Sequence, residues 1–234
     1  MTDATATVLF AGTLVVALVA SHRPVGDWIH RSVTATRHSR AERLVYRAIG
    51  ADPDGEQTWG AYARGVLAFS AVGVVGLYAL LRLQPHLPGG LGVPAMPADQ
   101  AWNTAVSFVT NTNWQYYGGE TTMSYFSQMA GLTVQNFVSA GVGIAVVVAL
   151  IRGLANRSGK SYIGNFWVDL FRAVAYVLLP ISLVAALVLI SQGVIQTLGG
   201  SVSLQGVAKG VEQTLALAHP DSVWAVRART RLRA

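Results

Sequence analysis

The stretch Ser107–Glu120, SFVTNTNWQYYGGE, sets four hydrogen-bonding residues, Thr110–Asn113, between two apolar segments. The short apolar segment Ala101–Val109 precedes them, and the long apolar run Met123–Ile151 follows soon afterwards. Asn and Thr side chains bond readily to nearby backbone and are common at external turns. The stretch is therefore either a simple turn or a polar loop with a binding role, and its surroundings must decide between these alternatives.

Composition places the chain among membrane proteins. Hydrophobic residues make up 52% of its 234 residues and charged residues 12%, against the roughly 25% charged residues of soluble domains. We therefore expect an all-α polytopic membrane protein. Four runs carry no charged side chain and approach or exceed the length needed to cross a bilayer. These runs are Ala4–Ala20, Gly65–Leu81, Met123–Ile151 and Ala173–Ser191.

The distribution of charge predicts the orientation of the spans. Six arginines fall within 21–60 and three basic residues within 152–167, whereas Gln84–Thr122 has no lysine or arginine. Basic loops stay on the cytoplasmic side of a membrane. We therefore expect Gln84–Thr122 and the N-terminus to be extracytoplasmic. The same clustering of arginines between apolar runs argues against nucleic acid as the partner of this chain of net charge +6.

The first span has a secretory signal peptide as its alternative. Val19–Ser21 loosely resembles a small-residue cleavage site. A signal peptide needs a basic segment before its apolar run, but here Asp3 precedes the run and Arg23 follows it. The order of charges favours a retained transmembrane helix.

The segment Ala101–Val109 is too short to span a membrane and is typical of a re-entrant helix. We expect this helix to begin with Asp99 as its N-cap and to end at Thr110. Its carboxyl end carries partial negative charge, which favours a nearby cation.

The chain must then return outward through Asn111–Gln115. Backbone at membrane depth that is not helical has to be buried in protein or line a cavity. A returning extended strand would present carbonyl oxygens, Thr hydroxyls and Asn amides, and such oxygens can replace the hydration shell of a monovalent cation. Glu120 at the outer mouth would add attraction for cations. This order of elements is that of a potassium-channel pore module.

The next helix carries a polar stripe that fits the same interpretation. Six small or polar residues fall within about 120° of one another on a helical projection. They either line a hydrated path or bond to neighbouring helices. The stripe consists of Ser124, Ser127, Gln128, Gly131, Gln135 and Ser139.

The segment NTAVSFVTNTNWQYYGGETTMSYFSQMAGLTVQNFVSAGVGIAVVVALIRG resembles the potassium-binding, channel-like subunit family (KdpA) of the Kdp potassium-transporting P-type ATPase. RPVGDWI, ERLVYRAIG and GNFWVDLFR are similar to the same family, and the resemblance extends to about Leu217. It implies four pore modules, each giving one filter strand. It also implies an extracytoplasmic potassium filter formed here by Thr110, Asn111, Thr112 and Asn113, with Gln115 as a nearby determinant of selectivity.

The resemblance also implies partners and a location. ATP would be hydrolysed by a separate P-type ATPase catalytic subunit, with small accessory subunits beside it, so the chain is not expected to be an enzyme on its own. The expected location is the bacterial plasma (inner) membrane, in contact with lipid. Potassium would be the transported ion, and no organic cofactor is expected.

The chain divides into six expected segments. They are an N-terminal transmembrane helix (1–20), a basic cytoplasmic segment (21–60), a first pore module (61–151), a cytoplasmic loop (152–172), the first span and start of a second pore module (173–217), and an atypical basic tail (218–234). No second glycine-rich filter follows Leu217, and the tail alternates arginine with other residues from Arg227 to Arg233. We hypothesise a frameshift or fragment boundary near Ala218; a tail that binds anionic lipid is the alternative.

Other motifs are weaker. GLANRSGKS at Gly153–Ser161 lacks the first glycine of a phosphate-binding loop and follows a membrane helix, so nucleotide binding is not expected. His22, His30 and His38 lack the spacing of metal ligands on one helix face. Arg172 is expected to extend from a helix end toward water. A truncated, non-transporting membrane fragment or an assembly protein remains the alternative function, and a secondary transporter would require an intramembrane carboxylate or broken helices in a second half.

Overall fold

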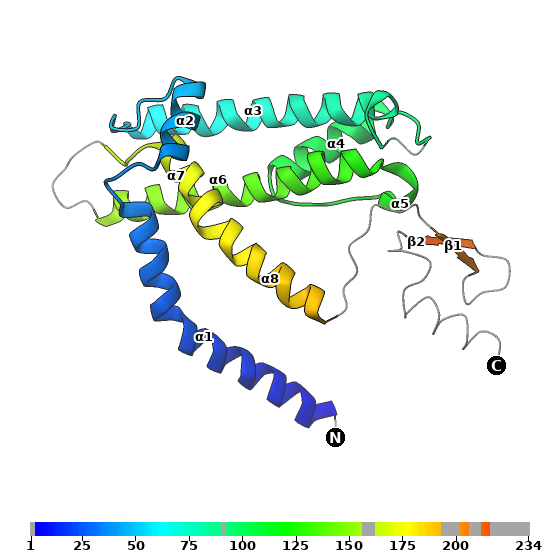
Figure 1. Ribbon diagram of the computed structural model, residues 1–234, viewed down its shortest axis with the longest axis horizontal. Helices are drawn as coiled ribbons and strands as arrows, with labels where there is room; N and C mark the ends of the chain where they lie inside the picture. Colours follow the sequence, from blue (N-terminus) through cyan, green and yellow to red (C-terminus); the bar gives the residue numbers. More distant parts are fainter. Residues whose placement is uncertain (1–2, 90–91, 156–161, 193–201, 206–211, 216–234) are drawn as a thin grey trace.

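The computed structural model describes residues 3–89, 92–155, 162–192, 202–205 and 212–215. Helices dominate these ranges, as Figure 1 shows. The elements are α1 (Asp3–Thr34), α2 (Arg40–Ile49), α3 (Trp59–Leu83), the 3-10 helix η1 (Gln84–His86), α4 (Ala98–Val109), α5 (Gly119–Thr122), the π-helix η2 (Ser127–Thr133), α6 (Val134–Ala155), α7 (Phe166–Arg172), the π-helix η3 (Ala173–Leu178), α8 (Leu179–Ser191), β1 (Val202–Gln205) and β2 (Glu212–Leu215).

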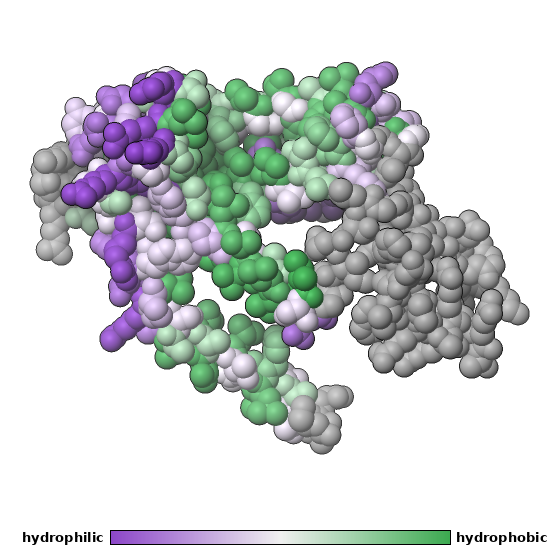
Figure 2. All heavy atoms as spheres, viewed as in Figure 1, coloured by the Kyte–Doolittle hydropathy of each residue, from purple (hydrophilic) through white to green (hydrophobic). Residues whose placement is uncertain are grey.

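Within the described ranges, four helical stretches are long and apolar enough to cross a membrane. They overlap the four predicted spans and confirm an all-α polytopic membrane protein. Figure 2 shows apolar surface along α1 and α8, and hydrophilic residues gathered at the end of the molecule that holds α2. The four stretches are Ala4–Thr34, Trp59–His86, Ser127–Ala155 and Phe166–Ser191.

The first helix is longer than predicted. It does not end at Ala20 but continues through Pro24 to Thr34, so the first part of the expected basic segment is helical. A proline removes one backbone hydrogen-bond donor. The helix is weakened at that point, but the turns before and after Pro24 keep their hydrogen bonds. The 32 residues of α1 extend for about 48 Å at the usual rise of about 1.5 Å per residue. Since the hydrocarbon core is about 30 Å thick, part of α1 must project beyond the membrane.

Helix α2 was not predicted, although its local sequence contains clear start and stop signals. The Ser39 hydroxyl accepts a hydrogen bond from the Glu42 amide at 3.2 Å, and the Glu42 carboxylate accepts one from the Ser39 amide. This reciprocal pair is a capping box. Gly50 ends the helix with φ 68°, a left-handed conformation that glycine adopts without steric penalty.

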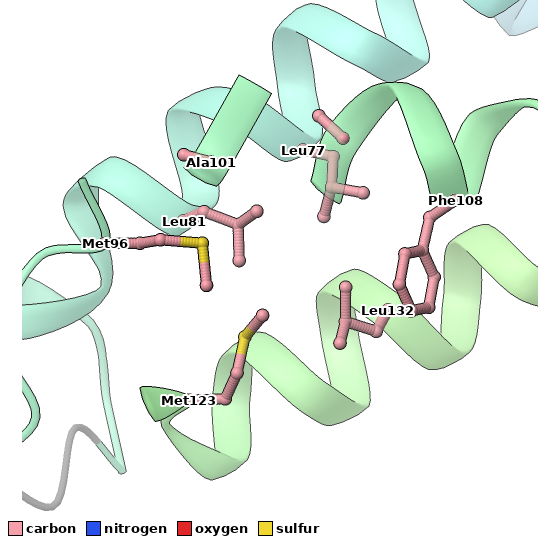
Figure 3. Packing of buried hydrophobic residues seen from close by; sticks show 8 residues of the cluster. Leu77, Leu81, Met96, Ala101, Phe108, Met123 and Leu132 are labelled. Carbon is pink, nitrogen blue, oxygen red and sulfur yellow. The ribbon is translucent and has the colours of Figure 1, made fainter. Parts of the chain in front are cut away.

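One hydrophobic cluster lies where α3, α4 and η2 meet, and Figure 3 shows its side chains pointing toward one another. The unbranched Met96 and Met123 fill the space between the helices. This packing fixes α4 against α3, and so fixes the position of the loop that follows α4. The buried members are Leu77, Leu81, Met96, Ala101, Ala105, Phe108, Met123 and Leu132.

A second cluster joins α3, α6 and α7 near the opposite end of the long helices. The ring of Phe166 lies at its centre and meets the rings of Tyr62 and Trp167 edge to face, at 5.5 and 5.0 Å between centroids. Gly141 allows α6 to approach η3 closely, because a Cβ added there would lie 2.6 Å from Cγ2 of Val174. Small residues serve this purpose widely in membrane helices.

The fourth helical stretch accommodates Pro180 by changing its helical type. The π-helix η3 precedes α8, and Pro180 lies in the first turn of α8. A wider turn before a proline relieves the clash between its ring and the carbonyl four residues earlier. In the same turn, the Ser182 hydroxyl donates to the Leu179 carbonyl at 2.9 Å.

A short antiparallel hairpin follows in the region expected to begin a second pore module. β1 pairs with β2, with Val202 opposite Leu215 and Gln205 opposite Glu212. Nothing in the sequence analysis predicted these strands. The tail 218–234, with its hypothesised frameshift, lies outside the described residues.

Candidate functional site

The short helix α4 is the first part of the candidate site. It runs beside α3 and ends at Thr110, as predicted. Asp99, however, is not the N-cap that we predicted. Pro97 occupies that position with an extended backbone (φ −50°, ψ 148°), and Asp99 lies inside the first turn, where a carboxylate still interacts favourably with the helix dipole.

The loop after α4 does not form the extended strand that we predicted. Asn111 and Asn113 adopt the left-handed region with φ 59° and 56°, and they are the non-glycine residues with positive φ among the described parts of the chain. Asparagine tolerates this region better than most residues. The chain therefore turns sharply at two alternate positions instead of running out straight.

The backbone amides of this loop are bonded back to the end of α4. The Asn111 amide donates to the Phe108 carbonyl at 3.3 Å, and the amides of Thr112 and Asn113 donate to the Ser107 carbonyl at 2.9 and 3.2 Å. These bonds satisfy carbonyls that a helix end otherwise leaves unpaired. In the described ranges, no hydrogen bond uses the carbonyl oxygens of the three loop residues, and all three residues are exposed. Their oxygens are available to a ligand.

The side chains of Thr110–Asn113 lie close to one another, and their role as a filter stays a prediction. The hydroxyls of Thr110 and Thr112 are 3.1 Å apart, and the Asn113 amide donates to the Asn111 side-chain oxygen at 3.5 Å. The Ser139 hydroxyl on α6 donates to the same oxygen at 3.3 Å. The patch therefore contains carbonyl, hydroxyl and amide oxygens, a set that suits a hard monovalent cation.

The other two predicted site residues lie outside this patch. The Gln115 side chain is exposed and donates to the Tyr117 hydroxyl at 3.0 Å, and no hydrogen bond between described residues joins it to Thr110–Asn113. Glu120 belongs to α5, but its side chain is not among those that the structure describes. Its attraction for cations stays a prediction.

The polar stripe on the helix after the loop does not form one continuous polar face. The π-helical turn η2 shifts the periodicity on which the projection relied. Gly131 contacts Leu77 and Leu80, and Gln135 faces Gly73, so these positions pack against α3. Ser139 is the member that reaches the loop. Contact with neighbouring helices therefore explains most of the stripe.

Sequence reasoning missed Gln84, which organises the outer end of the fold. Its side chain is fully buried and donates to the carbonyls of Pro94 and Thr122 at 2.6 and 3.0 Å. Its oxygen accepts from the Ser124 amide at 3.3 Å and from the Ser127 hydroxyl at 3.1 Å. A polar residue at the end of an apolar span was the available signal. Two residues of the stripe, Ser124 and Ser127, thus serve this network and not a hydrated path.

Two Arg–carboxylate pairs at the α2 end were also missed. Arg172 does not extend toward water as we predicted: it is 2% exposed, and its Nε donates to Glu42 at 2.8 Å. Arg152 forms a two-pronged pair with the buried carboxylate of Asp169, at 2.7 and 2.9 Å. Planar guanidinium groups match carboxylates in this way. The partners lie 130 residues apart in the first pair and 17 apart in the second, beyond the reach of a helical repeat, which explains why local patterns did not find them.

Burial raises the pKa of the Glu42 carboxyl, but hydrogen bonds from Arg172 and the Ser39 backbone, with the charges of Arg172 and His38, outweigh it. The net pKa of Glu42 lies below its usual range. The described ranges hold no group of three or more His, Cys, Asp or Glu side chains suited to a metal ion. The oxygen-rich loop after α4 is thus the candidate for binding a cation.

The fold and the loop define a class: a polytopic helical membrane protein with a short helix and a polar loop between two spans. Comparison with known proteins agrees with this class. The family model described as potassium-transporting ATPase A subunit, KdpA, matches residues 12–228. The chain belongs to this family. The match extends past Leu217, where we placed the end of the resemblance.

Three relatives carry the name potassium-transporting ATPase potassium-binding subunit. The protein from Mycolicibacterium vanbaalenii is 54% identical over 219 residues, covering 92% of this chain and 39% of the relative. That from Mycolicibacterium smegmatis is 52% identical over 217 residues, with the same coverage. That from Mycobacterium avium is 56% identical over 198 residues, 84% of this chain and 35% of the relative. The chain thus spans about two fifths of the length of the relatives it matches.

Proposed function

We propose that this chain supplies a potassium-selecting loop to the potassium-binding subunit of an ATP-driven potassium importer. The observation that carries the proposal is the geometry of Asn111–Asn113. These residues are exposed, and their three carbonyl oxygens take part in no hydrogen bond between described residues. The amides of these residues donate to carbonyls at the end of α4 and therefore do not bond to the three carbonyl oxygens of the loop. Carbonyl oxygens in this arrangement can replace water around a potassium ion.

The end of α4 supports a cation at this place. The carboxyl end of a helix carries partial negative charge, and α4 ends at Thr110, directly before the loop. The chain from Gln84 to Thr122 has no lysine or arginine to repel a cation. By the positive-inside rule we assign this loop and the N-terminus to the extracytoplasmic side of the bacterial inner membrane.

One loop cannot surround an ion by itself. A filter in this proposal needs four such loops, and this chain has one complete pore module, assigned to 61–151, before the start of another at 173–217. The remaining loops must come from other segments of a longer subunit or from partners. ATP hydrolysis belongs to the separate catalytic subunit, with the small accessory subunits in the same complex.

The proposal is tested by introducing charge at Gln115. The segment is placed in a full-length potassium-binding subunit and purified as the complete complex, and the potassium concentration for half-maximal ATPase activity is measured. A positive charge roughly 8 Å from a bound cation costs about 2 kcal/mol at an effective dielectric constant of about 20. We expect Gln115→Arg to raise the half-saturating concentration by at least about tenfold, and Gln115→Glu not to raise it. Equal affinities in the arginine variant and the unchanged protein would refute the assignment.

A further inference from the structure

Ser107, in the last turn of α4, is hydrogen-bonded to three residues of the segment that follows the helix: Thr112, Asn113 and Trp114. Its hydroxyl accepts a hydrogen bond from the Trp114 amide at 2.6 Å and lies 3.2 Å from the Trp114 carbonyl, to which it can donate. Its carbonyl accepts from the amides of Thr112 and Asn113. One residue thus holds both the middle of the loop and its far end.

The hydroxyl contacts depend on serine, whereas the carbonyl contacts do not. Any residue at this position offers a backbone carbonyl, but only a hydroxyl of this length can accept from one backbone group and donate to another. A helical serine often bonds instead to the carbonyl of the preceding turn. Here the hydroxyl bonds to the loop seven residues ahead. Trp114 thus accepts the one hydrogen bond that this hydroxyl can donate and donates one bond to it.

The loop needs such a restraint because its conformation is strained. Asn111 and Asn113 hold left-handed backbone angles, which persist where surrounding contacts fix them. A cavity of about 370 Å³ borders this part of the chain, with Ser107, Thr112 and Trp114 among its lining residues. The bonds to Ser107 restrain the loop where it borders this cavity.

We propose that Ser107 is a positioning residue for ion discrimination. By fixing Trp114, its hydroxyl sets the spacing of the carbonyl oxygens of Asn111–Asn113, and that spacing decides how well the loop distinguishes potassium from a cation of another size. This inference rests on the proposed function of the loop. In this proposal Ser107 acts through the backbone of Trp114, to which its hydroxyl is bonded, and not as a ligand of the ion.

The test compares Ser107→Ala with two variants in the complete complex. Ser107→Thr retains a hydroxyl, and Thr104→Val removes a buried hydroxyl one turn earlier, whose bond is to Met96 and not to the loop. ATPase activity is titrated with potassium and separately with rubidium. The ratio of the two half-saturating concentrations reports discrimination, and the maximal rate reports assembly.

We expect Ser107→Ala to raise the half-saturating potassium concentration about tenfold, equivalent to about 1.4 kcal/mol, and to bring the rubidium-to-potassium ratio closer to one. Ser107→Thr should preserve the ratio, and Thr104→Val should leave both values within about twofold. An unchanged ratio in Ser107→Ala overturns the inference. If the alanine variant does not assemble, Ser107→Cys, which keeps the volume but bonds weakly, provides the same comparison.

Failure of this inference is distinguishable from failure of the proposed function. If Gln115→Arg weakens potassium activation while Ser107→Ala preserves discrimination, the loop binds potassium and Ser107 does not position it. If neither substitution changes any titration, the loop is not the potassium site. A general loss of stability would lower the maximal rate of Ser107→Ala and Thr104→Val alike without changing the ion ratio.

Discussion

The guanidinium of Arg172 donates to the carboxylate of Glu42 at 2.8 Å across 130 positions of sequence, with both side chains almost completely buried. Arg172 also donates to the carbonyl of Ala35 at 2.6 Å. The pair therefore joins α7 to α2 and to the linker that follows α1. It sits at the end of the molecule that holds α2 (Figure 1), and it ties the linker after α1 to α7.

Removing the charge of Glu42 should destabilise the protein. Glu42→Gln leaves the Arg172 guanidinium buried without its counter-charge, and we expect the free energy of unfolding to fall by about 3 kcal/mol. The measurement is thermal or denaturant unfolding of the purified protein in detergent. Glu56→Gln makes the same chemical change at an exposed position and should have little effect. Equal unfolding midpoints for the two variants would show that the pair contributes nothing.

The same pair predicts a dependence of stability on pH. The folded-state pKa of Glu42 lies below the usual value of about 4.3. Its contribution to stability is therefore fully present above pH 4.3 and is lost as pH falls through the folded-state pKa. Unfolding measured from pH 6 downward should show the unchanged protein losing stability below about pH 4.3 more steeply than Glu42→Gln does. Parallel curves for the two proteins would contradict this prediction.

The asparagines of the loop allow a test of backbone conformation against side-chain chemistry. Asn113 has φ 56°, a region that glycine occupies freely and alanine occupies at a cost of about 1–2 kcal/mol. We expect Asn113→Gly to retain potassium activation of the complete complex within about threefold and Asn113→Ala to weaken it by about tenfold. If the glycine variant is as impaired as the alanine variant, the Asn113 amide, and not its backbone angle, is what the site needs.

Helix packing can be tested with two glycines that lie two residues apart. A Cβ on Gly141 would come within 2.6 Å of Val174, whereas a Cβ on Gly143 would meet no atom within 4 Å. We expect Gly141→Ala to lower the free energy of unfolding by about 1–3 kcal/mol through overpacking. Gly143→Ala should be neutral or slightly stabilising, since alanine favours a helix over glycine. Unfolding in detergent measures both, and a Gly141→Ala variant as stable as Gly143→Ala would show that η3 moves aside freely.

Much of the fold could be predicted from the sequence because its signals are local. The apolar runs predicted four spans since a bilayer requires about 20 consecutive apolar residues. The short helix α4 was found from its short apolar run, and its end at Thr110 was placed correctly. The residues of the candidate loop were found because a polar run between apolar segments is conspicuous. The boundaries were less accurate: α1 continues through Pro24, and Pro97 caps α4 in place of Asp99.

What the sequence by itself determined was the number of spans, the position of the short helix and the polar loop, because each depends on residues close together in the chain. Only the tertiary structure decided the pairing of Arg172 with Glu42, the burial of Gln84 and the bonds from Ser107 to the loop. The first two join segments far apart in sequence. The third depends on left-handed turns at Asn111 and Asn113, which bring position 114 back to the helix end in a way that no periodicity encodes.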